Sequence, residues 1–185
     1  MQEQSESGTG YPNQEIERLT LRDGTEVRLR PIRADDAPRL QQGFKQLSKE
    51  TIYLRFLKVF YELSDKQAYE FANLDYKTQI AFVGEIQENG EPALIAVARY
   101  ALVGEREPGM AEAAVVVRDD YQNLGMGTAA LQKLVGYAKE HGVSGFLATI
   151  HISNNRIMHF FEKSGLPYER KMLEPGTWEV RIYLS

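Results

Sequence analysis

The stretch GMAEAAVVVRDDYQNLGMGTAALQKLVGYAKEHG, residues 109–142, decides the fold because it predicts a strand, a glycine turn and a helix in succession. Residues 111–117 have the length and the β-branched ending of a buried strand. Gly125 and Gly127 then predict a turn. The apolar residues at positions 131, 134, 135 and 138 form one stripe of a helix, which ends before Gly142. Free backbone N–H groups and the positive end of the helix dipole therefore meet at the turn, where they suit a phosphate or pyrophosphate.

The composition is that of one ordinary globular domain. A chain of 185 residues can hide roughly 70% of its unfolded surface, and it is short for two domains. Apolar residues make up 43% of the chain and charged residues 26%, which excludes a disordered or fibrous class. The net charge of -4, without a basic stripe, argues against nucleic acid as a partner. The absence of cysteine excludes disulfides, a thiol nucleophile and a thiolate metal site.

The first residues, 1–14, are polar and predict a mobile tail, so a single domain is expected over residues 15–185. This segment has neither a basic start nor an apolar run, and no secretory signal is expected. Apolar runs elsewhere are shorter than the roughly 20 residues of a membrane span. We therefore expect no membrane partner and a cytoplasmic location.

Turn and capping signals predict the remaining elements. A first hairpin is centred on Asp23-Gly24, and helices are expected after Asp35, Ser48 and Ser64. Further strands are expected over residues 80–87, 93–103, 145–152 and 178–184, with a short helix over residues 157–164. This order predicts an α/β (α+β) fold, in which a mixed, mostly antiparallel sheet has flanking helices and a parallel strand pair at the glycine turn. Ligands enter open sheets at such junctions.

Two other phosphate-binding patterns fit the glycine turn less well. Residues 125–130 match G-x-G-x-x-A, but that dinucleotide fingerprint needs an acid near the end of the next strand, which ends in His151-Ile152-Ser153-Asn154. Thr128 stands where the phosphate loop of a nucleotide hydrolase needs lysine. A turn that binds no anion is the remaining alternative, because glycine is the normal residue at positive φ.

Two motifs at the right spacing carry a resemblance to a known family. Gln122-x-x-Gly125-x-Gly127 resembles the cofactor motif of the GNAT superfamily of acetyl-CoA-dependent N-acetyltransferases, and Asn154-x(10)-Gly165 resembles its later N-x(10)-G element. Residues 21–24, 29–32, 53–56, 75–76 and 81–83 are similar to the acetyltransferase domain of bacterial protein-lysine acetyltransferases. The resemblance covers residues 17–184 and extends the predicted fold to a GNAT-like sheet.

The resemblance implies a site for acetyl-CoA, that is, coenzyme A carrying an acetyl group. Main-chain groups of Val115 and Val117 would pair with the pantetheine arm, and the N–H near Val116 would face the thioester oxygen. Asn154 would bond the pantetheine amides or cap its own helix, and Phe161 would pack on the cofactor or belong to the core. The pyrophosphate would lie on the turn formed by Gln122, Asn123, Leu124, Gly125, Met126, Gly127 and Thr128.

Glu112 is the candidate general base. An amine with a pKa of about 10.4 is almost entirely ammonium at pH 7, so a carboxylate must remove a proton before attack. Glu112 is the single acid inside its strand, and its apolar neighbours would partly desolvate it. The alternative is a solvated carboxylate at the start of the strand. Where the family uses a tyrosine to protonate the leaving thiolate, this chain has Phe161, so that position supplies no side-chain general acid.

The acceptor would be an amine or a protein lysine, and the resemblance places Tyr53, Arg55 and Phe56 in the wall of its site. Their alternative role is core packing, which is usual for aromatic residues at helical spacing. The three histidines lie on different elements without ligand spacing, so no metal is expected. The leading hypothesis is an N-acetyltransferase that acts by direct attack. The alternatives are a non-catalytic acyl-CoA-binding sensor or adaptor and, less favoured, a dinucleotide-binding domain. A homodimer is left open.

Overall fold

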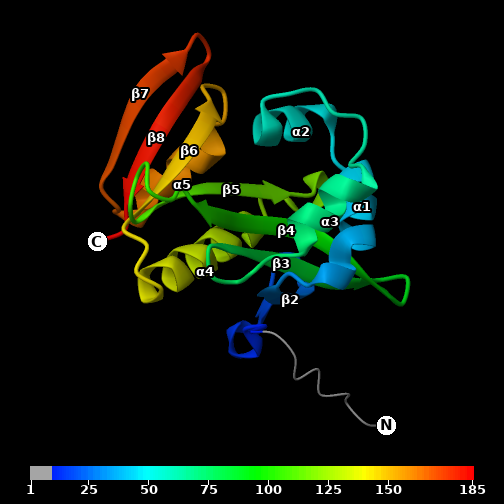
Figure 1. The fold of residues 1–185 in the computed structure, drawn as a ribbon. Coiled ribbons are helices and arrows are strands. Elements are labelled where there is room, and N and C mark those ends of the chain that lie inside the picture. Colours follow the sequence, from blue (N-terminus) through cyan, green and yellow to red (C-terminus); the bar gives the residue numbers. More distant parts are fainter. Residues whose placement is uncertain (1–9) are drawn as a thin grey trace.

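The computed structural model describes residues 10–185, which fold around one mixed eight-stranded sheet (Figure 1). Its strand order is β1-β2-β3-β4-β5-β6-β8-β7, and β5 and β6 are parallel whereas all other neighbours are antiparallel. This arrangement confirms the predicted fold class and the parallel pair at the glycine turn. The strands are β1 (Glu17–Thr20), β2 (Glu26–Pro31), β3 (Gln79–Glu88), β4 (Glu91–Leu102), β5 (Met110–Val117), β6 (Gly145–His151), β7 (Tyr168–Glu174) and β8 (Thr177–Tyr183).

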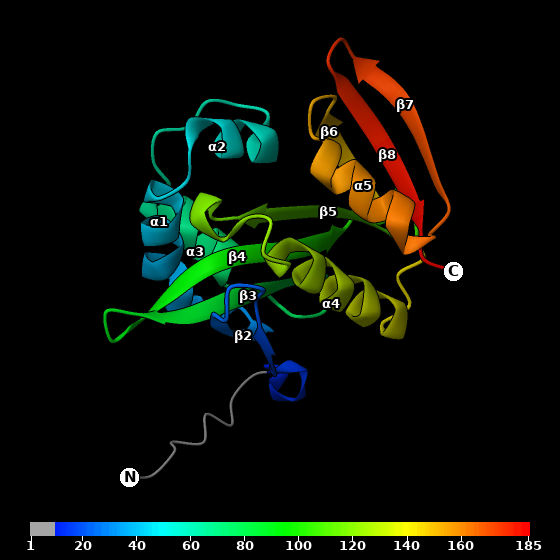
Figure 2. The same cartoon turned by 180° about the vertical axis from the view of Figure 1, so that it is seen from behind.

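Helices cover both faces of the sheet. On one face, α1 (Ala37–Lys45) and α3 (Asp65–Ala72) enclose a small core with β3, and α2 (Lys49–Phe56) stands above the end of β5 (Figures 1 and 2). On the other face, α4 (Met126–Glu140) and α5 (Asn155–Ser164) cover the main core. The predicted capping box of α3 is present, since Ser64 and Gln67 each accept a backbone hydrogen bond from the other.

The sequence pattern did not predict β7. Six of its seven side chains are exposed, so the strand lacks the alternation of apolar and polar residues that identifies a half-buried strand. It is held as an edge strand by its pairing with β8. The segment before β1 makes contacts with the sheet from Tyr11 onward, inside the range assigned above to a tail. The Tyr11 hydroxyl donates to the Pro31 carbonyl at 2.8 Å, and residues 1–9 lie outside the described part of the chain.

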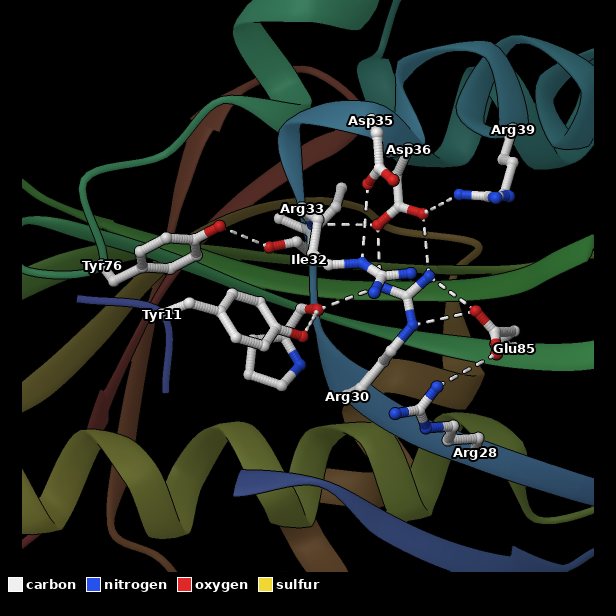
Figure 3. A network of polar contacts seen from close by, with 11 residues as sticks. Tyr11, Arg28, Arg30, Ile32, Arg33, Asp35, Asp36, Arg39, Tyr76 and Glu85 are labelled. Carbon is white, nitrogen blue, oxygen red and sulfur yellow. Dashed lines mark hydrogen bonds and ion pairs between the residues drawn. The ribbon is translucent and has the colours of Figure 1, made fainter. Parts of the chain in front are cut away.

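A buried ion network joins β2 and β3 to the start of α1 (Figure 3). The guanidinium of Arg30 donates to both carboxylate oxygens of Asp36, at 2.7 and 2.8 Å, and to Glu85 at 2.7 Å. Burial alone would raise the pKa of Asp36, but its hydrogen bonds with Arg30 and the positive charge beside it bring that pKa below the ordinary value. The network therefore fixes the position from which α1 begins.

Candidate functional site

The edge of β5 that faces β6 is open over most of its length. The parallel register runs from Met110↔Gly145 to Glu112↔Leu147, and beyond it the two strands diverge (Figure 2). In the antiparallel ladder of β4 and β5, hydrogen-bonded and non-hydrogen-bonded pairs alternate. The bond from Arg118 N to Ile95 O marks one hydrogen-bonded pair, and it therefore fixes the direction of every main-chain group in β5.

This alternation decides which groups can serve a ligand. The main-chain groups of Val116 are directed at β4, whereas those of Val115 and Val117 are directed at the open edge. The carbonyl of Val117 already accepts from Gln122 Nε2 at 2.9 Å. The open N–H groups are thus those of Val115 and Val117, as expected for these two residues. The N–H of Val116 itself is directed into the sheet, so the N–H near Val116 that would face a thioester oxygen is that of Val115 or Val117.

The glycine turn presents donors rather than acceptors to this edge. Asn123 and Gly125 both have positive φ, at 61° and 96°. The backbone N–H of Arg22 donates to Leu124 O and its side chain to Asn123 O, both at 3.2 Å, so these carbonyls are held on the β1–β2 turn. The N–H groups at the start of α4 have no intrahelical partner and suit an anion. The predicted residues from Gln122 to Thr128 therefore lie together, although the Met126 side chain is fully buried and leaves only its main chain for a ligand.

Close packing holds the start of α4 against β5. A Cβ atom added at Gly127 would lie 3.4 Å from Cγ2 of Val117, an ordinary contact distance, so the helix start packs directly on the strand edge. Gly125 has open space around it and is required by its φ instead. Gly125 is thus required by its backbone conformation, whereas Gly127 lies where the helix start packs on β5.

Gln122 acts as a connector. Its Nε2 donates to Val117 O at 2.9 Å and to Thr51 Oγ1 at 3.1 Å, and its Oε1 accepts from Arg156 of α5. The side chain therefore ties β5, α2 and α5 together around the opening. Arg156, which the sequence motifs did not indicate, brings a cation next to the glycine turn.

Asp119 links α2 to the cofactor side of the site. Its carboxylate accepts from Ser48 N at 2.8 Å, from Ser48 Oγ at 2.6 Å and from Thr51 Oγ1 at 2.8 Å. Some desolvation of this exposed carboxylate would raise its pKa, but the hydrogen bonds from Ser48 and Thr51 hold the pKa below its ordinary value. The first turn of α2 is thereby fixed to the loop that follows β5.

The Glu112 side chain lies on the same face of the sheet as α1, α2 and α3. It alternates with Ala114 and Val116, and Val116 lines a pocket beneath these helices. The Glu112 side chain is exposed, so its apolar neighbours in the strand do not bury the carboxylate. Exposure leaves the carboxylate accessible to an incoming amine or water.

The pocket beneath α1, α2 and α3 has a volume of about 80 Å³. Arg55 and Phe56 line it, and their contact with an acceptor stays a prediction. Tyr53 does not line it, because its ring is exposed and packs edge-on against His151 of β6, with 5.5 Å between the ring centroids. Two residues from other elements, Phe71 of α3 and Arg99 of β4, complete the pocket and were not among the expected site residues.

The second motif is divided between loop and core. Asn154 occupies the position before α5 without a side-chain capping bond, so the capping alternative is not seen. Phe161 is buried in the main core, as its core alternative expected.

Within residues 10–185, no three histidine, aspartate or glutamate side chains gather in a way that could hold a metal ion. No helix over the same residues is long and apolar enough to cross a membrane.

An open strand edge beside a glycine-rich helix start defines a site for a ligand that has both a peptide-like arm and a phosphate group. Coenzyme A has both features, and the donors present fit it. The chain belongs to the acetyltransferase (GNAT) family, whose pattern it matches over residues 49–166. Enzymes of this family use acetyl-CoA as cosubstrate.

Similar proteins agree with this assignment. An acetyltransferase of Pseudomonas aeruginosa is 35% identical over 123 residues, which are 66% of this chain and 65% of that protein. The acetyltransferase Pat of Mycolicibacterium smegmatis is 31% identical over 164 residues, 89% of this chain and 48% of that protein. The chain thus spans half to two thirds of the length of these relatives. The crystal structure of the GNAT domain of S. lividans PAT superposes with a TM-score of 0.81 at 30% identity, covering 93% of this chain and 98% of that one.

Proposed function

We propose that this chain is an N-acetyltransferase that moves an acetyl group from acetyl-CoA to a primary amine, with protein lysine as the first acceptor to test. The observation that carries the proposal is the open edge of β5, which lies directly beside the donors at the start of α4. The names of the relatives and the GNAT fold support acetyl transfer. The resemblance to bacterial protein-lysine acetyltransferases supports the lysine acceptor.

The main chain would bind the donor. The N–H groups of Val115 and Val117 would bond the pantetheine arm in the manner of an added strand, and the N–H groups from Gly125 to Thr128 would bond the pyrophosphate. Arg156, placed by Gln122, adds positive charge near the same turn. Bound acetyl-CoA supplies a thioester carbonyl whose carbon is open to a nucleophile.

Glu112 would act as the general base. The exposed carboxylate would take a proton from the acceptor ammonium, directly or through one water, so that a neutral amine nitrogen can form the new C–N bond. As the C–N bond forms, the nitrogen loses its remaining extra proton to water, the C–S bond breaks and the thiolate leaves. Because Phe161 is buried where the family's tyrosine acid would stand, the thiolate would take its proton from water, which a thiol pKa of about 8.5 allows. The chain has no cysteine, so transfer proceeds without a thioester on the protein.

The test is a thiol-release assay with acetyl-CoA against polyamines, amino acids, aminoglycosides and a panel of acidic proteins. Release of CoA that requires one of these amines supports the proposal. Calorimetric binding of acetyl-CoA without CoA release from any of them would support the non-catalytic sensor instead. Absence of acetyl-CoA binding would contradict both functions. A cytoplasmic location and a homodimer stay predictions.

A further inference from the structure

Two arginines in the pocket beneath α1, α2 and α3 have no acidic partner. Arg55 of α2 and Arg99 of β4 both line this cavity, and within residues 10–185 neither guanidinium forms an ion pair or a hydrogen bond. The buried arginines of the described chain form ion pairs. Arg30 contacts Asp36 and Glu85, and Arg118 contacts Glu88 and Asp120. The two pocket guanidiniums are therefore an exception that needs a physical reason.

Aromatic rings hold both guanidiniums in place. The Cζ atom of Arg55 lies 4.5 Å from the centroid of the Phe56 ring, and that of Arg99 lies 4.8 Å from the Phe71 ring. The two rings stack with their centroids 6.5 Å apart and an interplanar angle of 26°. Cation–π contact positions the charges but uses none of the N–H donors, which stay available for a planar anion.

The surroundings favour an anion. Burial and then the nearby charge of Arg99 lower the pKa of Arg55 to about 10, and burial lowers the pKa of Arg99 as well. Both groups are nonetheless cations at neutral pH. Two like charges beside apolar walls repel each other and have lost part of their hydration. A carboxylate between them would remove both penalties, because guanidinium and carboxylate match in geometry.

The pocket also lies beside the proposed reacting centre. Arg99 is in register with Ala114 and Val97 with Val116, so Arg99 is one strand away from the open edge of β5. Glu112 shares the face of β5 that carries Ala114 and Val116. The volume of about 80 Å³ holds several waters, since roughly 10–15 Å³ of such space holds one, or a short carboxylate-bearing group.

We propose that Arg55 and Arg99 bind a carboxylate carried by one of the two reactants. The inference rests on the proposed function, because it names the substrate chemistry of that same site. The carboxylate belongs either to the acceptor, as in an amino acid whose amine is acylated, or to the acyl chain of the donor, as in a dicarboxylic acyl-CoA. Both sources present the same planar anion to the same two guanidiniums.

The experiment measures thiol release for two donors and matched acceptors. Acetyl-CoA is compared with succinyl-CoA, and each free amino acid is compared with its carboxamide. A carboxylate on the acceptor predicts a kcat/KM at least about tenfold higher for the free acid, the factor that one charge-assisted hydrogen bond supplies. A carboxylate on the donor predicts the same preference for succinyl-CoA. Either preference, taken as the ratio of the two kcat/KM values measured on the same variant, should fall to about one in Arg55→Gln and in Arg99→Gln.

Controls separate the site from the fold. Arg106→Gln removes an exposed arginine in the β4–β5 loop and should leave the preference intact. Thermal unfolding of each variant checks folding, and Arg99→Lys, which keeps the charge, should restore part of the preference. Calorimetry with succinate tests the site without turnover. We expect succinate to bind the unmodified chain and to bind the double Arg55→Gln, Arg99→Gln variant at least tenfold more weakly.

The outcomes distinguish this inference from the proposed function. Thiol release with acetyl-CoA and neutral amines, without any carboxylate preference and without succinate binding, would overturn the inference alone. Succinate binding that survives the double variant would also overturn it. No thiol release with any donor and acceptor would contradict the proposed function, whereas succinate binding that requires both arginines would still support the anion site.

Discussion

The two halves of the candidate site differ in the groups that they present to a ligand. The half proposed to bind the cofactor presents main-chain groups, namely the open edge of β5 and the N–H groups at the start of α4. The half proposed to bind the acceptor presents side chains from α1, α2, α3 and β4, which meet in one pocket. A main-chain site is fixed by strand pairing and glycine conformation and tolerates varied side chains, whereas a side-chain site changes its ligand with each substitution. The difference predicts that variants in the two halves will affect binding and turnover separately.

The largest effect is expected at the junction of the halves. Glu112→Gln removes the proposed base and should lower kcat by about 10²- to 10⁴-fold at pH 7, the usual contribution of general base catalysis. Because the side chain is exposed, the free energy of unfolding should change by less than about 0.5 kcal/mol. Acetyl-CoA affinity, measured by calorimetry, should stay within twofold. Full activity of this variant at pH 7 would remove Glu112 from the mechanism.

The next largest effect is expected in the buried ion network, which fixes the start of α1 and so supports the acceptor half. Asp36→Asn leaves the buried Arg30 without one of its two carboxylate partners and should lower the free energy of unfolding by about 3–5 kcal/mol in urea titrations at pH 7. Asp35→Asn is the matched control, because its side chain is exposed and should change stability by less than about 0.5 kcal/mol. Equal loss in both variants would contradict a specific role for the buried network.

The same carboxylate gives a pH dependence. The pKa of Asp36 is lower in the folded chain than in the unfolded chain, so its contribution is complete above the unfolded pKa of about 3.9. It is lost as pH falls through the lower folded value. Stability measured between pH 7 and pH 5 should therefore show no loss from this group, and the difference between Asp36→Asn and the unmodified chain should shrink at strongly acidic pH.

A variant in the glycine turn should affect the cofactor half alone. Gly125 has φ of 96°, so Gly125→Val would cost about 1–3 kcal/mol of backbone strain or turn the N–H groups away from the ligand. We expect the Kd for acetyl-CoA to rise about 10- to 100-fold by calorimetry, with succinate binding at the pocket unchanged. Gly136→Ala in the middle of α4 is the control, since a Cβ there meets open space. An unchanged Kd in Gly125→Val would place the pyrophosphate elsewhere.

The main-chain half could be predicted from the sequence, and the reason is local. Gly125, Gly127 and the valine run of β5 act through backbone conformation and strand pairing, which short-range patterns encode. The sequence did not show which N–H near Val116 is free, because the direction of an N–H group depends on which pairs of the β4–β5 ladder are hydrogen-bonded. That alternation follows from register, and register between strands is not visible in a single strand's pattern.

The side-chain half could be predicted only in part. Arg55 and Phe56 were found through resemblance, whereas Phe71 and Arg99 reach the pocket from elements distant in sequence. One signal was present, because Arg99 interrupts an apolar run in β4 as Glu112 interrupts the apolar run of β5. A charge inside a strand that is otherwise apolar needs a partner, and this reasoning applies to both residues. Tyr53 packs against His151 and Phe161 belongs to the main core, so their proposed contacts with acceptor and cofactor stay predictions.

The smallest effect is expected where the two halves are joined. Asp119→Asn weakens the three hydrogen bonds that fix Ser48 and Thr51 to the loop after β5. Because the carboxylate is exposed, the loss should be about 0.5–1 kcal/mol, which appears as a two- to fivefold rise in the acceptor KM with little change in acetyl-CoA affinity. Asp120→Asn is the control, since that carboxylate contacts Arg118 rather than α2. If Asp119→Asn raised the acceptor KM and the Kd for acetyl-CoA equally, α2 would serve both halves, and the division between a main-chain half and a side-chain half would not hold.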